Sequence, residues 1–383
     1  MPSMNHFDYI IIGNGLAGLQ LALEFSKDSF FDDKQIALID LSNKNKNDKT
    51  WCFWEKGLGN WNHIVYKSWD TAKFYASKKT LNINLKPYKY KMIRSLDFYQ
   101  DAKARLSKKE NFCFIIDEVT NVEEKGLVTI TTKNTSYSAN HVFDSRIDGS
   151  FFKEKDNFTR INQHFKGWVI ETESDVFNSE KFTMMDYRLK DGEQTSFSYV
   201  LPFSSKKALV EFTYFTSKIV EDCTYDNYLG KYISDILKIK NHTITEVETG
   251  NIPMTDFPFK KYSTNHITKI GTAAGWVKGS TGYSFKHTEK KVSKIVRNLK
   301  HQNIPSKGLC NKKHQFYDAV FLKVLKDDNH KGEWIFEQFY SKNSIKTMFK
   351  FLDEESSFFE ELKIMYSLFS ISFIKAFYKT LVI

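Results

Sequence analysis

Residues 13–18, Gly-Asn-Gly-Leu-Ala-Gly, constrain the fold of this chain more than any other stretch. They follow a short apolar run, DYIIIG (8–13), and precede LAGLQLALEFSK (16–27), in which apolar residues recur at helical spacing. A second apolar run, QIALID (35–40), ends in an acidic residue. This order predicts a strand, a tight turn, a helix and a second strand, which is the βαβ unit that opens an α/β fold.

The glycine spacing fits a dinucleotide-binding turn in the expected context. Gly13 permits the sharp turn, Gly15 lets the backbone approach a pyrophosphate, and Gly18 lets helix and strand pack closely. The start of the helix then offers unpaired N–H groups to the phosphates. An acid at the end of the second strand accepts hydrogen bonds from ribose hydroxyls. The predicted cofactor contacts here are Gly13, Asn14, Gly15, Ala17, Gly18 and Asp40.

A second glycine-rich stretch, GTAAGWVKGSTGY (271–283), favours FAD over NAD. The first motif alone does not separate the two, but a βαβ unit at the N-terminus with a late, small-residue return of the chain is typical of FAD enzymes. Small residues before a helix permit a close approach to a flavin ring. We expect Gly275, Thr281 and Gly282 to contact FAD. Arg94 is a further candidate for the FAD phosphates, with a surface ion pair as the alternative.

The rest of the chain predicts an inserted sheet and a helical end. Strand patterns alternate through residues 165–215, with SSKK (204–207) as a hairpin turn, and helical patterns dominate from about residue 313. The expected division is a discontinuous FAD-binding domain (1–160 and 256–300), a β-sheet substrate-binding region (161–255) and a helical C-terminal region (301–383).

Composition narrows the function classes. The chain has 383 residues, 41% hydrophobic and 27% charged, and a formal charge of +10. Its Lys residues are scattered and form no nucleic-acid signature, so we expect no nucleic-acid partner. Four distant cysteines and isolated histidines predict reduced thiols and no metal site. A strand pattern already begins by Tyr9 and no apolar stretch reaches ~20 residues, so we expect neither a signal peptide nor a spanning helix.

One acid, Glu211, stands inside an apolar strand pattern, LVEFTYF (209–215). Burying an unpaired carboxylate costs several kcal/mol unless its pKa rises and keeps it neutral. The pattern therefore leaves two readings open. Either Glu211 pairs with a Lys or Arg elsewhere, or it is a neutral acid used in chemistry.

With these pieces together, the sequence resembles the bacterial FAD-dependent lycopene β-cyclases over nearly its whole length. The resemblance rests on the following stretches, in this order: DYIIIGNGLAGLQLA, DKTWCFW, QHFKGWVIE, MDYR, YVLPFSSKKALVEFTYF, GNIPMT and GTAAGWVKGSTGYSF. It implies the flavoprotein fold shared with aromatic hydroxylases and geranylgeranyl reductases. Relatives usually carry Gly-Asp where this chain has Gly271-Thr272, and many cyclases carry a second acid where it has Phe212.

The resemblance also implies a reaction. Glu211 would protonate the end group of lycopene, with reduced FAD stabilising the cation and NAD(P)H as the electron source. Trp51, Trp54 and Trp61 could line a polyene tunnel or pack in the core. The alternatives are a flavin-dependent monooxygenase or isoprenoid double-bond reductase, and a non-enzymatic carotenoid-binding, membrane-associated protein.

Lycopene is dissolved in membrane, so the enzyme has to reach it there. We expect a cytoplasmic protein held peripherally at the inner face of the cell membrane. Its last segment (366–383) would lie at the interface with Lys375 and Lys379 toward the headgroups, or would pack on the core.

Overall fold

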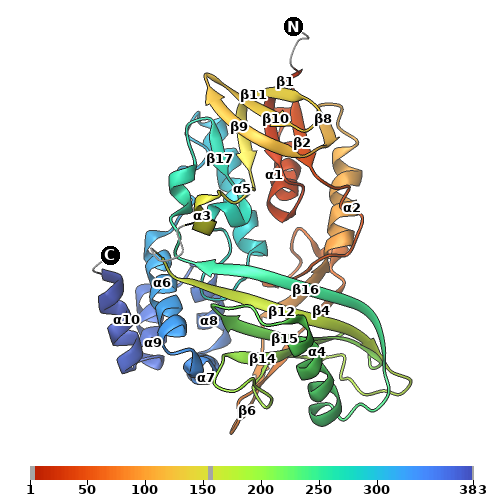
Figure 1. Cartoon of the computed structure of the whole chain (residues 1–383), viewed down its shortest axis with the longest axis vertical. Coiled ribbons are helices and arrows are strands. Elements are labelled where there is room, and N and C mark those ends of the chain that lie inside the picture. The colour runs from red at the N-terminus through yellow and green to blue at the C-terminus, as the bar shows by residue number, and fades with distance from the viewer. Residues whose placement is uncertain (1–4, 154–157, 382–383) are drawn as a thin grey trace.

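A computed structural model describes residues 5–153 and 158–381, which form three sheets flanked by helices (Figure 1). The first sheet has the order β8-β2-β1-β11-β10-β9, with β17 beside β11. Its core pairs are parallel, and β9, β10 and β11 form an antiparallel meander. Its strands are β1 (Asn5–Ile12), β2 (Ile36–Asp40), β8 (Phe112–Ile116), β9 (Val119–Lys125), β10 (Leu127–Thr132), β11 (Ser136–Asp144) and β17 (Ile267–Lys269). The predicted α/β class is confirmed.

The apolar run of β1 is buried on both faces because the sheet is covered on both sides. Ile11 packs into a cluster with the helices of one face, whereas Ile10 and Ile12 join a cluster with the meander. The helices of this layer are α1 (Leu16–Ser26), α2 (Ser95–Leu106) and α5 (Phe285–Lys300), and α1 contacts both α2 and α5. Strand β17 and helix α5 thus return to the sheet on which the chain began.

The second sheet crosses below the first (Figure 1) in the order β16-β12-β15-β14-β13-β5-β6. It is antiparallel except where β13 pairs with β5. Its strands are β5 (Thr71–Tyr75), β6 (Thr80–Asn84), β12 (Arg160–Glu171), β13 (Lys181–Asp186), β14 (Ser196–Pro202), β15 (Lys207–Thr216) and β16 (Thr243–Thr255).

The second sheet corrects the domain division made from sequence. Residues 71–84 were assigned with 1–160 to the FAD-binding domain, but they form β5 and β6 at the edge of this second sheet. The pairing of β5 with β13 joins distant parts of the chain, and no local pattern in the sequence reports it. A third, small sheet connects the two larger ones through β3 (Thr50–Lys56), β4 (Lys67–Trp69) and β7 (Tyr88–Arg94).

Strand β15 has two buried faces with different neighbours. Val210, Phe212 and Tyr214 pack with the helix α4 (Asp222–Lys231), which a π-helical turn, Tyr232–Ile236, extends. Leu209 and Phe215 join the core on the other side, toward the C-terminal helices. Because side chains alternate along a strand, Glu211 and Thr213 share the face of Leu209 and Phe215.

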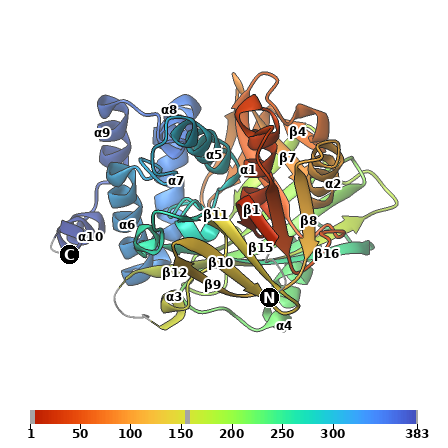
Figure 2. The same ribbon diagram turned by 90° about the horizontal axis from the view of Figure 1, so that it is seen from above.

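The C-terminal helices stand at the level of the second sheet in Figure 1, and Figure 2 shows them to one side of the strands. The short helix α3 (Ser150–Lys153) precedes β12. The C-terminal set is α6 (Lys312–Asp327), α7 (Gly332–Lys342), α8 (Ile345–Leu352), α9 (Phe358–Ser367) and α10 (Ile371–Leu381). Helix α9 begins with a capping box, in which Ser357 and Glu360 satisfy each other's backbone N–H groups. Of the helices in residues 5–153 and 158–381, none has the length and apolar character needed to cross a bilayer.

Candidate active site

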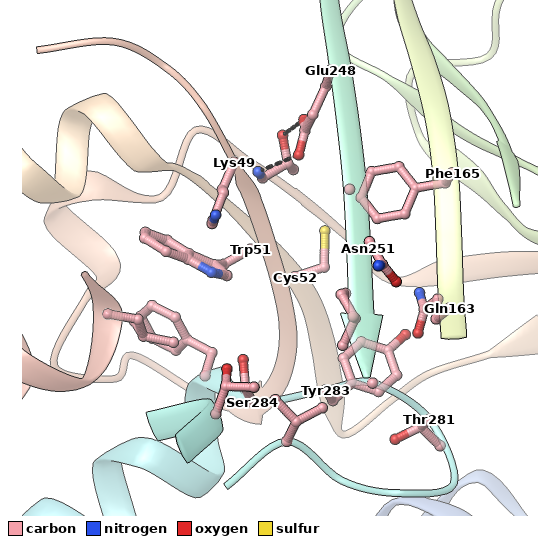
Figure 3. A pocket seen from close by; sticks show the side chains of 18 of the residues that line it. Lys49, Trp51, Cys52, Gln163, Phe165, Glu248, Asn251, Thr281, Tyr283 and Ser284 are labelled. Carbon is pink, nitrogen blue, oxygen red and sulfur yellow. Dashed lines mark hydrogen bonds between the residues drawn. The ribbon is translucent and has the colours of Figure 1, made fainter. Parts of the chain in front are cut away.

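One cavity of about 580 Å³ lies where the glycine-rich turn, the small third sheet, the second sheet and the start of α5 meet. Figure 3 shows Lys49, Trp51 and Cys52 on one side and Phe165, Gln163 and Glu248 on the other. Of the residues predicted from sequence, Gly13, Gly15, Ala17, Gly18, Glu211, Thr281 and Gly282 line this cavity. Asn14, Asp40, Arg94 and Gly275 are not among its lining residues.

The glycine-rich turn has the geometry that a dinucleotide needs. Gly13 has φ +98°, and a Cβ there would lie 2.0 Å from the Ser145 hydroxyl oxygen. A Cβ at Gly18 would lie 2.0 Å from the carbonyl oxygen of Gly13, so only glycine permits this helix-strand approach. Beside Gly15, no atom lies within 4 Å of the corresponding point. This open space at the N-terminus of α1 fits a pyrophosphate.

Asp40 lies next to the turn, at the end of β2. The backbone N–H of Asn14 donates to its Oδ2 at 2.7 Å, and that of Ser42 donates to its Oδ1 at 2.9 Å. Asp40 therefore braces the turn. Its Oδ1 also accepts from the Ser42 hydroxyl and pairs with Lys44, whereas its Oδ2 retains a lone pair for a ribose hydroxyl. The side-chain oxygen of Asn14 is buried and has no partner within the described residues.

The second glycine cluster also fits a cofactor. Gly271, Gly275 and Gly282 have φ values of +63°, +66° and +75°, which favour glycine. Gly275 ends the short 3-10 helix Gly271–Ala274 rather than facing the cavity. Thr281 Oγ1 and Gln163 Oε1 are buried without partners in the part of the chain described here. Unpaired polar atoms beside a cavity match the polar edge of a flavin, so the residues present fit FAD.

Arg94 lies at the junction of β7 and α2 and pairs with Glu246. Its Nη2 lies 2.7 Å from Glu246 Oε2, and its guanidinium stacks on Tyr66. A phosphate contact for Arg94 stays a prediction. The cations that line the cavity are instead Lys44 and Lys49, which sequence reasoning missed because they sit in a polar stretch that resembles an ordinary loop.

Glu211 projects from β15 into the same cavity. It is 8% exposed, and Thr213 Oγ1 donates to its Oε1 at 2.6 Å. No Lys or Arg among the described residues forms an ion pair with it. The structure therefore does not support the interpretation that Glu211 pairs with a Lys or Arg. Burial raises the pKa of the Glu211 carboxyl to about 8, against the opposing effect of the Thr213 hydrogen bond.

A second carboxyl, Glu248, faces the cavity from β16. In the sheet register, Glu211 on β15 and Glu248 on β16 both lie opposite Gly167 on β12. The three residues form one row across adjacent strands, so they share a face, and Gly167 places no side chain between the two carboxyls. Thr50 donates its backbone N–H and its hydroxyl to Glu248, at 2.8 and 2.6 Å (Figure 3). Burial raises the pKa of Glu248.

Phe212, where a second acid was expected from the resemblance, points away from the cavity. Its ring stacks on Tyr228 of α4 with centroids 4.7 Å apart. An acid at position 212 would therefore lie under α4, whereas Glu248 faces the cavity. Sequence reasoning missed Glu248 because Glu248 lies in one row with Glu211 only through the register of both strands with β12.

Aromatic side chains line the space around Glu211. The hydroxyl of Tyr90 lies 2.9 Å from that of Tyr199 and 2.8 Å from that of Tyr283. Burial raises the pKa of the nearby Cys52 thiol to about 12, so the thiol stays protonated. Of the three tryptophans considered from sequence, Trp51 lines the cavity, whereas Trp54 and Trp61 pack in the two cores. No cluster of potential metal ligands occurs in residues 5–153 and 158–381.

A comparison with known protein families identifies the family of this chain. The family described as "Lycopene cyclase protein" matches residues 8–377. The chain belongs to the lycopene cyclase family. A comparison with curated protein sequences finds no match.

Solved structures of low sequence identity share the fold. A geranylgeranyl bacteriochlorophyll reductase-like protein from Thermoplasma acidophilum superposes with a TM-score of 0.61 at 14% identity, covering 99% of this chain and 100% of that one. The flavin-dependent brominase Bmp2 gives 0.61 at 12% identity, with coverage of 91% and 93%. A flavoprotein/dehydrogenase from Cytophaga hutchinsonii gives 0.61 at 11% identity, with coverage of 94% and 100%. The lycopene cyclase family member thus has the Rossmann-type flavoprotein fold.

Proposed function

We propose that the protein is a lycopene β-cyclase that closes the linear ends of lycopene to β-ionone rings without net redox change, giving γ-carotene and β-carotene. The observation that carries this proposal is Glu211, a buried carboxyl with its pKa raised to about 8 in an aromatic-lined cavity. Such a group is protonated at neutral pH and can act as an acid. Membership of the lycopene cyclase family supports the substrate.

The chemistry balances with Glu211 alone. Its proton goes to C2 of the terminal double bond, which leaves a tertiary cation at C1. The C5–C6 double bond attacks C1, so the C1–C6 bond forms and the charge moves to C5. Loss of the C6 proton to the Glu211 carboxylate forms the ring double bond and restores the acid. No electron is gained or lost, so the reaction is an isomerisation.

The cavity supplies the surroundings that this cation needs. Water would trap the cation as an alcohol, so the apolar side chains beside Glu211, Phe197, Leu209 and Phe215, would serve to limit its access. The rings of Trp51, Phe165 and Tyr283 line the cavity and present faces that attract positive charge. When bound, reduced FAD would add a fixed negative charge near the cation, with NAD(P)H keeping the flavin reduced.

The outer face of α9 and α10 supports a peripheral contact with membrane. Large apolar side chains recur there every three to four residues and point outward on both helices, which is the spacing of an interfacial helix. They are Phe358, Phe359, Leu362, Met365, Tyr366, Phe369, Ile371, Ile374, Phe377, Tyr378 and Leu381, called here the apolar face. We propose that this face lies on the cytoplasmic leaflet. Lys375 is exposed at its edge, whereas Lys379 pairs with Asp327 at 2.6 Å, and residues 382–383 lie outside the described chain.

Expression in a lycopene-accumulating bacterial host tests the function. We expect γ-carotene and β-carotene by chromatography, with NAD(P)H consumption far below product formation. Hydroxylated or saturated products formed one-to-one with NAD(P)H would instead indicate a monooxygenase or a double-bond reductase. Bound but unchanged lycopene, with FAD-loaded protein present, would indicate a carotenoid-binding protein.

Vesicle flotation tests the membrane contact. We expect the protein to float with vesicles rich in anionic lipid, and a Phe359→Asp, Tyr366→Asp variant to remain in the soluble fraction. These side chains are 80% and 83% exposed, so the substitutions leave the core intact. Equal flotation of both proteins would remove the apolar face from this role.

A further inference from the structure

A second cavity, of about 330 Å³, lies between the C-terminal helices. It is lined from α6, α7, α8, α9 and α10, mainly by phenylalanine, leucine, isoleucine and valine side chains. Its aromatic lining includes Phe316, Phe321 and Phe339. A cavity with so little polar lining suits a hydrocarbon and offers few groups to hold a polar ligand.

The inner end of this groove meets the active-site cavity. Thr281 and Phe336 line both cavities, so the two spaces are separated there by a wall one residue thick. Phe336 comes from α7, and its neighbour along that helix, Tyr340, lines the active-site cavity. The ring of Phe336 also lies edge-on to that of Phe215, with centroids 5.8 Å apart, and Phe215 shares a face of β15 with Glu211.

The outer end opens on the apolar face. Five groove-lining side chains are also members of that exposed set: Met365, Phe369, Ile374, Phe377 and Tyr378. Phe369 is 70% and Tyr378 64% exposed. Apolar lining thus extends from the surface proposed to face the bilayer inward to Phe336, and the active-site cavity with Glu211 begins on the other side of that side chain.

We propose that this groove is the site through which the polyene leaves the bilayer and in which its unreacted part is held while one end lies at Glu211. The inference rests on the proposed function. The glycine-rich turn would take FAD on one side of the active-site cavity, so a long linear chain has to extend on the other. The apolar surface that the polyene buries in the groove favours binding without desolvating a polar group.

Two other molecules could fill an apolar groove, and each would leave a different sign from the polyene. A lipid acyl chain would bring a headgroup to the mouth, and a second copy of the chain would cover the mouth. The closeness of the groove to the active-site cavity at Phe336 serves neither of these, but it is needed for a substrate whose reacting end must reach Glu211.

Binding of a neutral, linear conjugated hydrocarbon tests the groove without relying on catalysis. The probe is diphenylhexatriene, which fluoresces in apolar surroundings, added to FAD-loaded protein in the absence of vesicles. The key variant is Ile374→Asp, which places a carboxylate in the groove wall, and its matched control is Leu362→Asp. Leu362 is exposed on the same apolar face but does not line the groove. A second pair is Phe377→Asp in the groove and Tyr366→Asp outside it.

We expect probe affinity to fall about tenfold or more in both groove variants, because a lost apolar contact of this size changes binding by at least that factor. The two control variants should bind like the wild type, and lycopene should displace the probe. Equal probe binding in all five proteins would overturn the groove proposal, as would displacement by phospholipid but not by lycopene. FAD content and melting temperature verify that each variant is folded.

The same variants separate the groove from the function. If the wild type cyclises lycopene but the groove variants bind probe normally, the groove proposal fails and the cyclase proposal stands. If probe binding follows the expected pattern but no cyclised product forms, the groove stands and the cyclase proposal fails. On vesicle-borne lycopene, Ile374→Asp should raise KM at an unchanged kcat, since Glu211 is untouched.

Discussion

Replacement of Glu211 by Gln should stabilise the protein by an amount that depends on pH. Burial raises the pKa of this carboxyl from 4.5 to about 8. Below pH 4.5 the group is neutral in both folded and unfolded chains, so it has no effect on stability. As pH rises, the unfolded chain ionises first, and the wild type loses stability until the folded group also ionises near pH 8. Gln is neutral throughout and avoids this loss.

The size of the effect follows from the shift. One pKa unit corresponds to about 1.4 kcal/mol, so the whole shift corresponds to about 5 kcal/mol. Between pH 5 and pH 8 the free energy of unfolding of the Gln variant should gain about 4 kcal/mol relative to wild type. Gln keeps an oxygen to accept from Thr213, so the local hydrogen bond survives.

Urea unfolding at four pH values from 5 to 8, with FAD in fixed excess, measures the difference. Glu171→Gln is the matched control, since Glu171 is an exposed residue of the adjacent strand β12 and should leave the pH dependence as in wild type. A Glu211→Gln difference that stays constant with pH would refute the claim that this carboxyl is buried and neutral. In a separate activity assay, cyclisation should decline progressively as the pH rises above 8, because the Glu211 carboxyl then loses its proton.

Three further outcomes test other parts of the site. Glu248→Gln removes a negative charge that raises the pKa of Glu211, so the alkaline limit of activity should move to lower pH. FAD content should be unchanged. An unmoved limit would show that the two carboxyls do not interact. Gly18→Ala should abolish FAD binding and lower the melting temperature, because its Cβ would lie 2.0 Å from a backbone oxygen. Gly15→Ala should fold normally and weaken FAD binding about tenfold or more. Flavin absorbance measures FAD binding in both variants. Phe212→Asp should destabilise the fold by about 3–5 kcal/mol in urea, since it buries a charge under α4 and removes a core ring. A Phe212→Asp variant that is as stable as wild type would contradict the assignment of its side chain to that face.

Part of the site could be predicted from sequence because it depends on contacts between residues that are close together in the chain. The turn from Gly13 to Gly18 depends on contacts within a few residues, and the alternation along β15 already separates Glu211 from Phe212. The resemblance added the chemistry of Glu211. The structure then placed the ring of Phe212 against Tyr228, on the face of β15 opposite Glu211.

Other features depend on which strands pair. Glu248 lies in one row with Glu211 only because both strands flank Gly167 of β12, and residues 71–84 join the second sheet only because β5 finds β13. The same holds for the groove, whose walls come from five helices. Sequence by itself determined the cofactor turn, the α/β class and the acid on its strand, since each follows from neighbouring residues. Tertiary structure alone decided what faces that acid and where an apolar groove lies beside its cavity, because those contacts join residues that are far apart in the chain.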